Sequence, residues 1–144
     1  MFSMKVDVSN QALSVQFNSL LKKVASYCLK KLVIKKNISV VLVNDEKIQE
    51  LNKIYRKKNK VTDVLSFGDW NDKDFLGEVI ICLPQAKRQA KKYGTNLKQE
   101  LTRLLAHGIL HLAGLDHERS KTEETKMFKL QEQIIEKICS ISAK

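Results

Sequence analysis

The sequence predicts a single α+β domain in which helices pack on one four-stranded mixed β-sheet. Its 144 residues are enough to bury one hydrophobic core, and we assign residues 1–144 to one domain. Short β-branched runs alternate with longer segments of helical periodicity along the chain. Two of the expected strands also follow each other directly, joined by the polar segment "GDWNDKDF", and a hairpin within an alternating chain makes the sheet mixed.

The first four elements follow from periodicity and capping. Residues 4–8 alternate enough to form a strand, and residues 11–32 carry apolar side chains at helical spacing. The run "ISVVLV" at 38–43 is β-branched and predicts a buried strand. Asn44 can then cap a second helix.

The next three elements are a strand pair and a helix. Strands are expected at 62–67 and 76–83, on either side of the polar hairpin loop. Pro84 is the chain's one proline and suits the first turn of a helix, which we expect to end at Gly94. The resulting order is β-α-β-α-β-β-α, with two helices still to follow.

Two capping patterns define the last two helices. Asn96, with Gln99 three residues later, predicts the start of a helix that ends near Gly114. Ser120 and Glu123 form a second capping box, which begins the final helix. The apolar stripe of that helix consists of Met127, Leu130, Ile134 and Ile138.

The charge of the chain indicates a polyanionic partner. Its 26 Lys and Arg against 16 Asp and Glu give a formal net charge of +10, which favours nucleic acid or an anionic membrane surface. Two basic runs without an acid, at 53–60 and 84–94, favour a groove for a polyanion. The alternative is a lysine bias of the whole proteome, since charge bears on association and not on fold.

A cytoplasmic location fits the remaining composition. No stretch approaches the length of a membrane span, and the N-terminus has no signal-peptide pattern, so we expect no membrane association. Cys28, Cys82 and Cys139 are odd in number and far apart, which indicates neither a disulfide framework nor a cysteine metal site. We expect each to be a small core residue.

The segment "HGILHLAGLDH" at 107–117 contains every histidine in the chain. His107 and His111 are four residues apart on one helix, so their Cβ atoms should lie roughly 5–6 Å apart on one face. Gly114 permits a left-handed turn that ends the helix, after which His117 can return as a third ligand. Three imidazoles that leave one position for water are the pattern of a catalytic Zn²⁺ site, here at the end of a helix.

The histidine spacing is that of the zinc-protease signature H-E-x-x-H-x-x-G-x-x-H, but Gly108 stands in place of the general-base glutamate. A glycine in mid-helix costs about 1 kcal/mol relative to alanine, so we expect a neighbouring strand to approach it closely. Another residue must supply the base, or zinc suffices by lowering the pKa of its water to about 7. Three histidines without a metal, or with nickel, copper or iron, remain alternatives.

The chain resembles the YbeY-type bacterial rRNA maturation factors, a family of metal-dependent endoribonucleases specific for single strands. The resemblance spans residues 38–118. "HGILHLAGLDH" is similar to the family's H-G-x-L-H-L-x-G-x-D-H, "LNKIYRKKNKVTDVLSF" to its arginine, basic stretch and T-D-V-L-S-F, and "LGEVIIC" to its strand L-G-(D/E)-(I/V). The family often has Asp and Pro before this threonine and Pro after S-F, where this chain has residues 59–61 and Gly68. Arg56 corresponds to the family's arginine, and these departures in the loop after it could change where Arg56 lies.

The resemblance implies a cytoplasmic, zinc-dependent, single-strand-specific endoribonuclease that acts in 16S rRNA 3′-end maturation and ribosome quality control. Single-stranded RNA, 16S rRNA and the small ribosomal subunit or its proteins are the implied partners, while the oligomeric state is left open. His107, His111 and His117 are the implied ligands of one Zn²⁺ ion, and Arg56 is the implied catalytic residue. Its planar fork could hold a phosphate in two hydrogen bonds; the alternative is one more solvated cation.

Two other functions compete with this one. A ribosome assembly factor could bind rRNA through the same basic runs and use the metal only to fix the loop at Gly114. A metalloprotease would explain the histidine spacing, but it lacks the glutamate. Only one capped helix follows His117, and it offers no evident turn carrying the methionine typical of that protease family.

Overall fold

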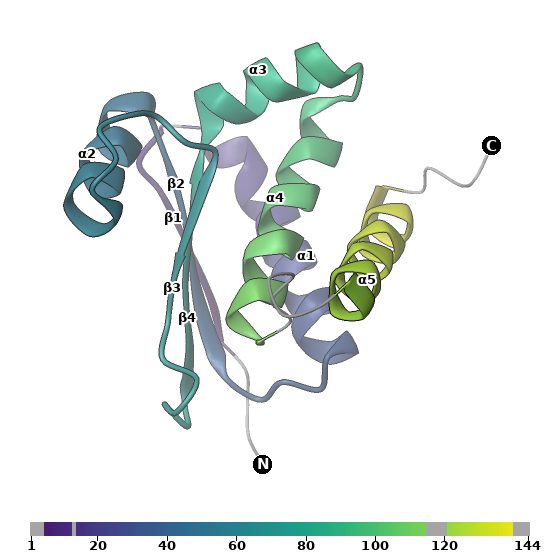
Figure 1. The fold of residues 1–144 in the computed structure, drawn as a ribbon. Helices are drawn as coiled ribbons and strands as arrows, with labels where there is room; N and C mark the ends of the chain where they lie inside the picture. The colour runs from purple at the N-terminus through teal and green to yellow at the C-terminus, as the bar shows by residue number, and fades with distance from the viewer. Residues whose placement is uncertain (1–4, 13, 115–120, 140–144) are drawn as a thin grey trace.

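The structure is a computed structural model, and it describes residues 5–12, 14–114 and 121–139 (Figure 1). Within these residues the elements follow the order expected from the sequence. The strands are β1 (Val6–Asn10), β2 (Asn37–Val43), β3 (Val64–Phe67) and β4 (Phe75–Cys82). The α-helices are α1 (Asn18–Lys31), α2 (Asp45–Arg56), α3 (Leu83–Tyr93), α4 (Leu97–Leu112) and α5 (Lys121–Cys139), and a short 3-10 helix (Val15–Phe17) precedes α1.

The four strands form one mixed sheet, as predicted. Their order across the sheet is β1-β2-β4-β3. β1 and β4 both run parallel to β2, and β3 pairs antiparallel with β4 through the hairpin. Within the described residues, β3 is therefore an edge strand that pairs only with β4.

Helices cover the two faces of the sheet unequally (Figure 1). α1 and α4 lie against one face with α5 packed outside them, while α2 lies against the opposite face. Successive side chains of β2 and β4 point to opposite faces of the sheet. Val40 and Val79 belong to the larger core, whereas Val41 and Ile80 belong to the smaller core beneath α2. The two central strands are apolar on both faces, which explains why they appear as continuous hydrophobic runs.

Three elements begin later than predicted, and β1 is one of them, spanning Val6–Asn10 rather than residues 4–8. The first helix begins at Asn18 rather than near residue 11, because the side chain of Asn10 holds the preceding turn. Its Oδ1 accepts hydrogen bonds from the amides of Ala12 and Ser14, each at 3.1 Å, and such local bonds compete with a helix. β3 begins two residues later than expected, at Val64, whose amide donates to Oδ1 of Asp63 at 2.7 Å.

The predicted helix starts and ends are mostly confirmed. Asn96 and Gln99 exchange both hydrogen bonds of a capping box, at 2.8 Å and 3.1 Å. Gly94 adopts a left-handed φ of 70° directly after α3. Asn44 occupies the N-cap position of α2 but makes no side-chain capping bond there. Ser120 and the side chain of Glu123 lie outside the described residues, so that capping box stays a prediction.

The glycine in the middle of α4 lies against the sheet. A Cβ atom on Gly108 would stand 2.8 Å from Cγ1 of Val79, a fully buried residue of β4. The close approach of a strand that the sequence predicted is therefore confirmed. It brings α4 close enough to the sheet for one end of β3 and the side chains of α4 to line a common cavity.

The cysteines and the helices agree with the other expectations from composition. Cys28 and Cys82 are buried free thiols, and burial raises the pKa of each to about 12. Cys139 is a half-buried free thiol. Among the described helices, none is both long and apolar enough to cross a bilayer.

Candidate metal and phosphate site

His107 and His111 line one cavity of about 330 Å³, as their spacing on α4 predicted. The cavity lies where α4 faces the end of α2, the loop that follows it, and β3. Its other lining residues are Arg56, Thr62, Asp63, Val64, Ser66, Arg103 and Leu104. Two imidazoles, two guanidinium groups and one carboxylate thus meet in a single polar hollow.

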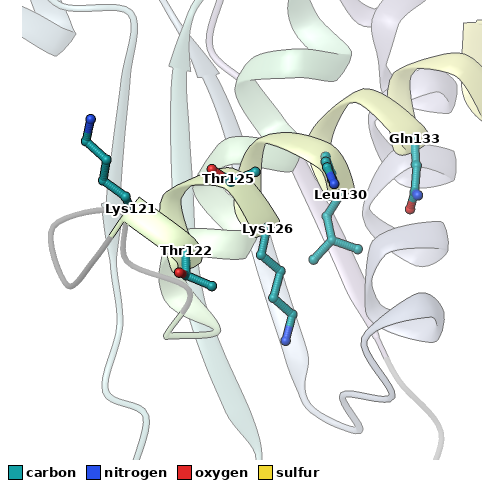
Figure 2. Close-up of a pocket in the computed structure, with 7 residues that line it drawn as sticks. Lys121, Thr122, Thr125, Lys126, Leu130 and Gln133 are labelled. Carbon is teal, nitrogen blue, oxygen red and sulfur yellow. The ribbon is translucent and has the colours of Figure 1, made fainter.

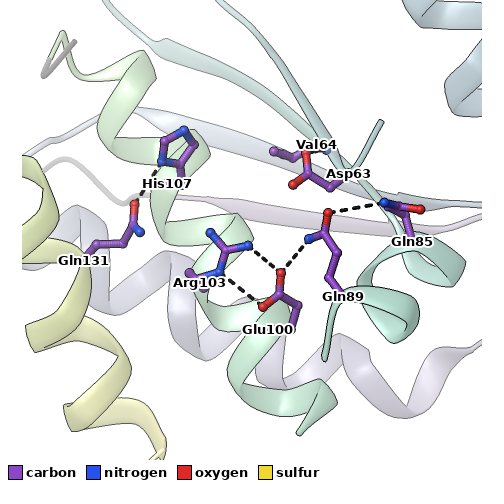
Figure 3. A network of polar contacts seen from close by, with 8 residues as sticks. All are labelled: Asp63, Val64, Gln85, Gln89, Glu100, Arg103, His107 and Gln131. Carbon is purple, nitrogen blue, oxygen red and sulfur yellow. Dashed lines mark hydrogen bonds and ion pairs between the residues drawn. The ribbon is translucent and has the colours of Figure 1, made fainter. Parts of the chain in front are cut away.

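The ring of His107 is oriented by a side chain from another helix (Figure 3). Its Nδ1 lies 2.9 Å from Oε1 of Gln131, which is on α5 and only 7% exposed. Because an amide oxygen only accepts hydrogen bonds, Nδ1 is the donor in this contact, and the bond fixes the orientation of the ring. Metal-binding histidines are oriented in this way by a hydrogen bond to the other ring nitrogen, so His107 fits the role of a zinc ligand.

The helix ends beyond His111 as the sequence predicted. Gly114 has a left-handed φ of 87°, and its amide donates to the carbonyl oxygen of His111 at 3.1 Å. The turn needed to return a third ligand is therefore present. His117 itself lies outside the described residues, so its part in a metal site stays a prediction. Among the residues that are described, no cluster of three or more His, Cys, Asp or Glu side chains could hold a metal ion.

Arg56 lines the same cavity as the two histidines, in spite of the unusual loop that follows it. It is the last residue of α2, which Lys57 ends with a left-handed φ of 58°. The loop is then fixed by Asn52, which is 2% exposed and donates from Nδ2 to the carbonyl oxygen of Lys60 at 3.0 Å. A second bond, from Gln49 to Asn59 at 3.1 Å, holds the loop against α2.

Arg103 is a cavity residue that the sequence interpretation missed. Its guanidinium is held by the buried carboxylate of Glu100 through two hydrogen bonds, with Nε 3.2 Å from Oε1. Glu100 is 2% exposed and also accepts a bond from Nε2 of Gln89 at 2.7 Å (Figure 3). The bond to Glu100 raises the pKa of Arg103 against the opposing effect of burial, so the cation persists in the cavity. Arg103 precedes His107 by four residues, and that helical spacing was a usable signal.

The structure leaves no space for a protease base at position 108. A side chain there would be directed at Val79 of β4 rather than into the cavity, since even its Cβ would be 2.8 Å from the valine. Among the described residues that line the cavity, Asp63 has the one carboxylate side chain. Its Oδ1 accepts a hydrogen bond from the amide of Val64. The zinc-protease arrangement of a glutamate between the two histidines is thus excluded by packing.

A larger hollow of about 600 Å³ lies on the outer face of α5 (Figure 2). Its described lining residues all belong to that helix and include Lys121, Lys126 and Lys129. No histidine or carboxylate is among them, so this hollow suits polyanion binding better than acid–base or metal chemistry.

Comparison with known proteins identifies the relatives of this chain. A family model described as "Endoribonuclease YbeY" matches residues 3–139. A protein of Persephonella marina named "Endoribonuclease YbeY" is 49% identical over 108 residues, covering 72% of this chain and 71% of that protein. One of Aquifex aeolicus with the same name is 44% identical over 104 residues, covering 70% and 69%. The solution structure of TM1509 from Thermotoga maritima superposes with a TM-score of 0.71 at 28% identity, covering 92% of this chain and 88% of that one.

Proposed function

The chain belongs to the YbeY endoribonuclease family, and from this premise we propose that it cleaves RNA in the cavity lined by His107, His111 and Arg56. It is an endoribonuclease, a hydrolase of RNA phosphodiester bonds, in a metalloenzyme family of rRNA maturation. The assignment of the reaction to this cavity is supported above all by the bond from His107 to Gln131, which orients the ring as metal-binding histidines are oriented.

We propose that His107, His111 and His117 hold one Zn²⁺ ion and leave one coordination position open. When bound, zinc would supply a Lewis acid that polarises a phosphoryl oxygen and activates the attacking nucleophile. The two described histidines come from one rigid helix, so their relative positions are fixed before any metal binds. Gly114 supports the return of His117, because only a left-handed residue reverses the chain so soon after the helix.

We propose that Arg56 and Arg103 hold the phosphate from two sides. A guanidinium can donate two parallel hydrogen bonds to phosphate oxygens, and this geometry is strongest where water is partly excluded. Arg56 comes from the end of α2 and Arg103 from α4, so a phosphate in the cavity would contact two separate elements. Fixed donors of this kind stabilise the charge that accumulates on phosphate in the transition state.

The substrate we propose is single-stranded rRNA, at the 3′ end of 16S rRNA, in the cytoplasm and in contact with small-subunit proteins. The net charge of +10 and the exposed lysines of the 57–60 loop support a polyanionic ligand. A role in ribosome quality control belongs to the same proposal, and we take residues 1–144 as the one domain that carries it.

A non-catalytic assembly factor is the second candidate, and the basic surfaces favour it equally. A variant with His111→Ala separates the two, because it removes a ligand while leaving those surfaces unchanged. We expect this variant to remain folded, lose bound zinc and lose cleavage of a single-stranded RNA, while Lys22→Ala, at an exposed lysine of α1, retains zinc and cleavage. A folded, zinc-free His111→Ala protein that still matures 16S rRNA in cells would instead support the assembly factor.

A further inference from the structure

A second, smaller hollow adjoins the proposed reaction cavity and shares His107 with it. It has a volume of about 170 Å³ and lies between α4 and the first half of α5. Its lining residues are His107, Glu124, Met127, Phe128 and Gln131. The imidazole therefore stands between two unlike spaces, one lined by arginines and the other by an aromatic ring and a thioether.

Phe128 is exposed although its helix has a well-buried apolar face. The core side of α5 includes Met127, Ile134 and Ile138, each no more than 4% exposed, whereas Leu130 of the predicted stripe is only partly buried. Phe128 is outside that stripe, and 60% of it is accessible to solvent. A large aromatic ring exposed at this position is available to a ligand, and proteins that bind single strands stack bases on such rings.

The charges around the smaller hollow favour a base over a phosphate. Glu124 is an acceptor-only carboxylate on its rim, and it would repel the RNA backbone. The amino and imino N–H groups of a nucleobase, by contrast, can donate to it. Backbone phosphates have alternatives on either side: the arginines of the main cavity, and Lys126 and Lys129 on the outer face of α5.

We propose that this hollow is a nucleobase subsite for the nucleotide next to the scissile phosphate. The base stacks on Phe128, with Met127 beneath it and an N–H group directed at Glu124. The subsite rests on the proposed function, because its continuity with the cavity through His107 is what places it beside the cleaved bond. It gives the enzyme a preference for an unstacked base, which a single strand supplies and a duplex withholds.

The test combines Phe128 variants with RNA that lacks single bases. Short single-stranded substrates carry one abasic residue at successive positions around the cleavage site, and KM and kcat are measured for each. We expect Phe128→Leu to raise KM roughly tenfold with little change in kcat, and Phe128→Tyr to restore it, because only the second keeps a stacking surface. An abasic residue at one flanking position should raise KM for the wild type but add nothing for Phe128→Leu.

Trp70→Ala provides the matched control, since Trp70 is another exposed aromatic residue and is 55% accessible. In this variant the penalty for the same abasic position should be as large as in the wild type. Two results would overturn the subsite: a KM of Phe128→Leu equal to that of the wild type, or an abasic residue that raises the KM of Phe128→Leu as much as that of the wild type at every position. Phe128 would then be a surface residue available to a protein partner.

A binding measurement separates failure of the subsite from failure of the proposed function. The same RNAs are titrated against the wild type and Phe128→Leu with a chelator present to prevent cleavage, and fluorescence anisotropy gives the affinity. Loss of coupling between Phe128 and the abasic position in binding rejects the subsite even if cleavage is intact. If Phe128 and the abasic position remain coupled in binding while His111→Ala cleaves as well as the wild type, the subsite is retained. The metal-centred reaction is then rejected.

Discussion

Gln131 accepts a hydrogen bond from Nδ1 of His107 at 2.9 Å, so a buried amide on α5 sets the orientation of an imidazole on α4. The two residues are 24 positions apart and belong to different helices. The orientation of a proposed metal ligand therefore depends on the packing of α5 against α4. The predictions below test this dependence and the other contacts that define the cavity.

Replacing Gln131 with Met should weaken zinc binding about 10–100-fold, because the tautomer and ring orientation of His107 would no longer be fixed. Competition with a chromogenic chelator measures the dissociation constant. Gln131→Glu keeps an acceptor and should bind zinc at least as tightly as the wild type. Gln133→Met, at an exposed glutamine on the same helix, is the control and should change nothing. Wild-type affinity in Gln131→Met would mean that the bond does not orient a ligand.

Arg56→Lys should separate RNA binding from RNA cleavage. Lysine keeps the positive charge but loses the planar fork, so affinity and its salt dependence should stay near the wild type. Cleavage should fall by roughly tenfold or more, about 1.4 kcal/mol in transition-state stabilisation. In Lys57→Ala and Lys58→Ala we expect the reverse: weaker binding, a salt slope smaller by about one, and an unchanged single-turnover rate. Wild-type cleavage in Arg56→Lys would show that Arg56 is a solvated cation without a catalytic role.

Glu100→Gln should slow cleavage by about tenfold or more through Arg103, which would lose its charged anchor while keeping its own charge. The expected signature is a lower kcat with a nearly constant KM. Asp45→Asn is a matched control, because it breaks the ion pair with Arg88, whose Nη2 lies 2.7 Å from Asp45 Oδ1, and neither residue lines the cavity. Equal loss of activity in both variants would point to a general loss of stability, which urea unfolding would reveal.

Gly108→Ala should destabilise the fold, although alanine is the better helix former by about 1 kcal/mol. The new methyl group would lie 2.8 Å from Cγ1 of Val79, a β-branched side chain with no free rotation in the core, and overpacking of this kind costs about 1–3 kcal/mol. We therefore expect a net loss of roughly 1 kcal/mol in the free energy of unfolding, measured in urea.

The same substitution in a Val79→Ala background is the control for that prediction. With the valine methyl groups removed, Gly108→Ala should become stabilising by up to about 1 kcal/mol, the helix-propensity term alone. An identical effect in both backgrounds would show that the approach of β4 is not what keeps a glycine in the helix.

The fold could be predicted from the sequence because most of its elements are specified locally. β2 and β4 are apolar on both faces, and the capping box of Asn96 is contained within four residues, so each leaves a pattern that can be detected without tertiary knowledge. The start of α1 could not be predicted in this way. There the helical periodicity extends through residues that the side chain of Asn10 holds in a turn instead.

Spacing along the chain predicted the part of the candidate site on α4, and the family resemblance supplied Arg56 on α2. His107, His111 and the glycine turn follow from spacing along one helix, and Arg103 would have followed from the same spacing. Gln131 and the loop anchor Asn52 could not be found, since they reach the site through packing between helices and through a single bond to a loop carbonyl. The part played by His117 remains a prediction, because it lies outside the described residues.

The hydrogen bond between α4 and α5 also has a consequence for biosynthesis. A ribosome makes His107 and His111 well before it makes Gln131, which follows His107 by 24 residues. A growing chain therefore carries both imidazoles for a time without the amide that fixes the first of them. For an RNA-cleaving enzyme assembled on an RNA machine, the order of synthesis delays the fixing of the His107 ring until α5 has been translated and docked.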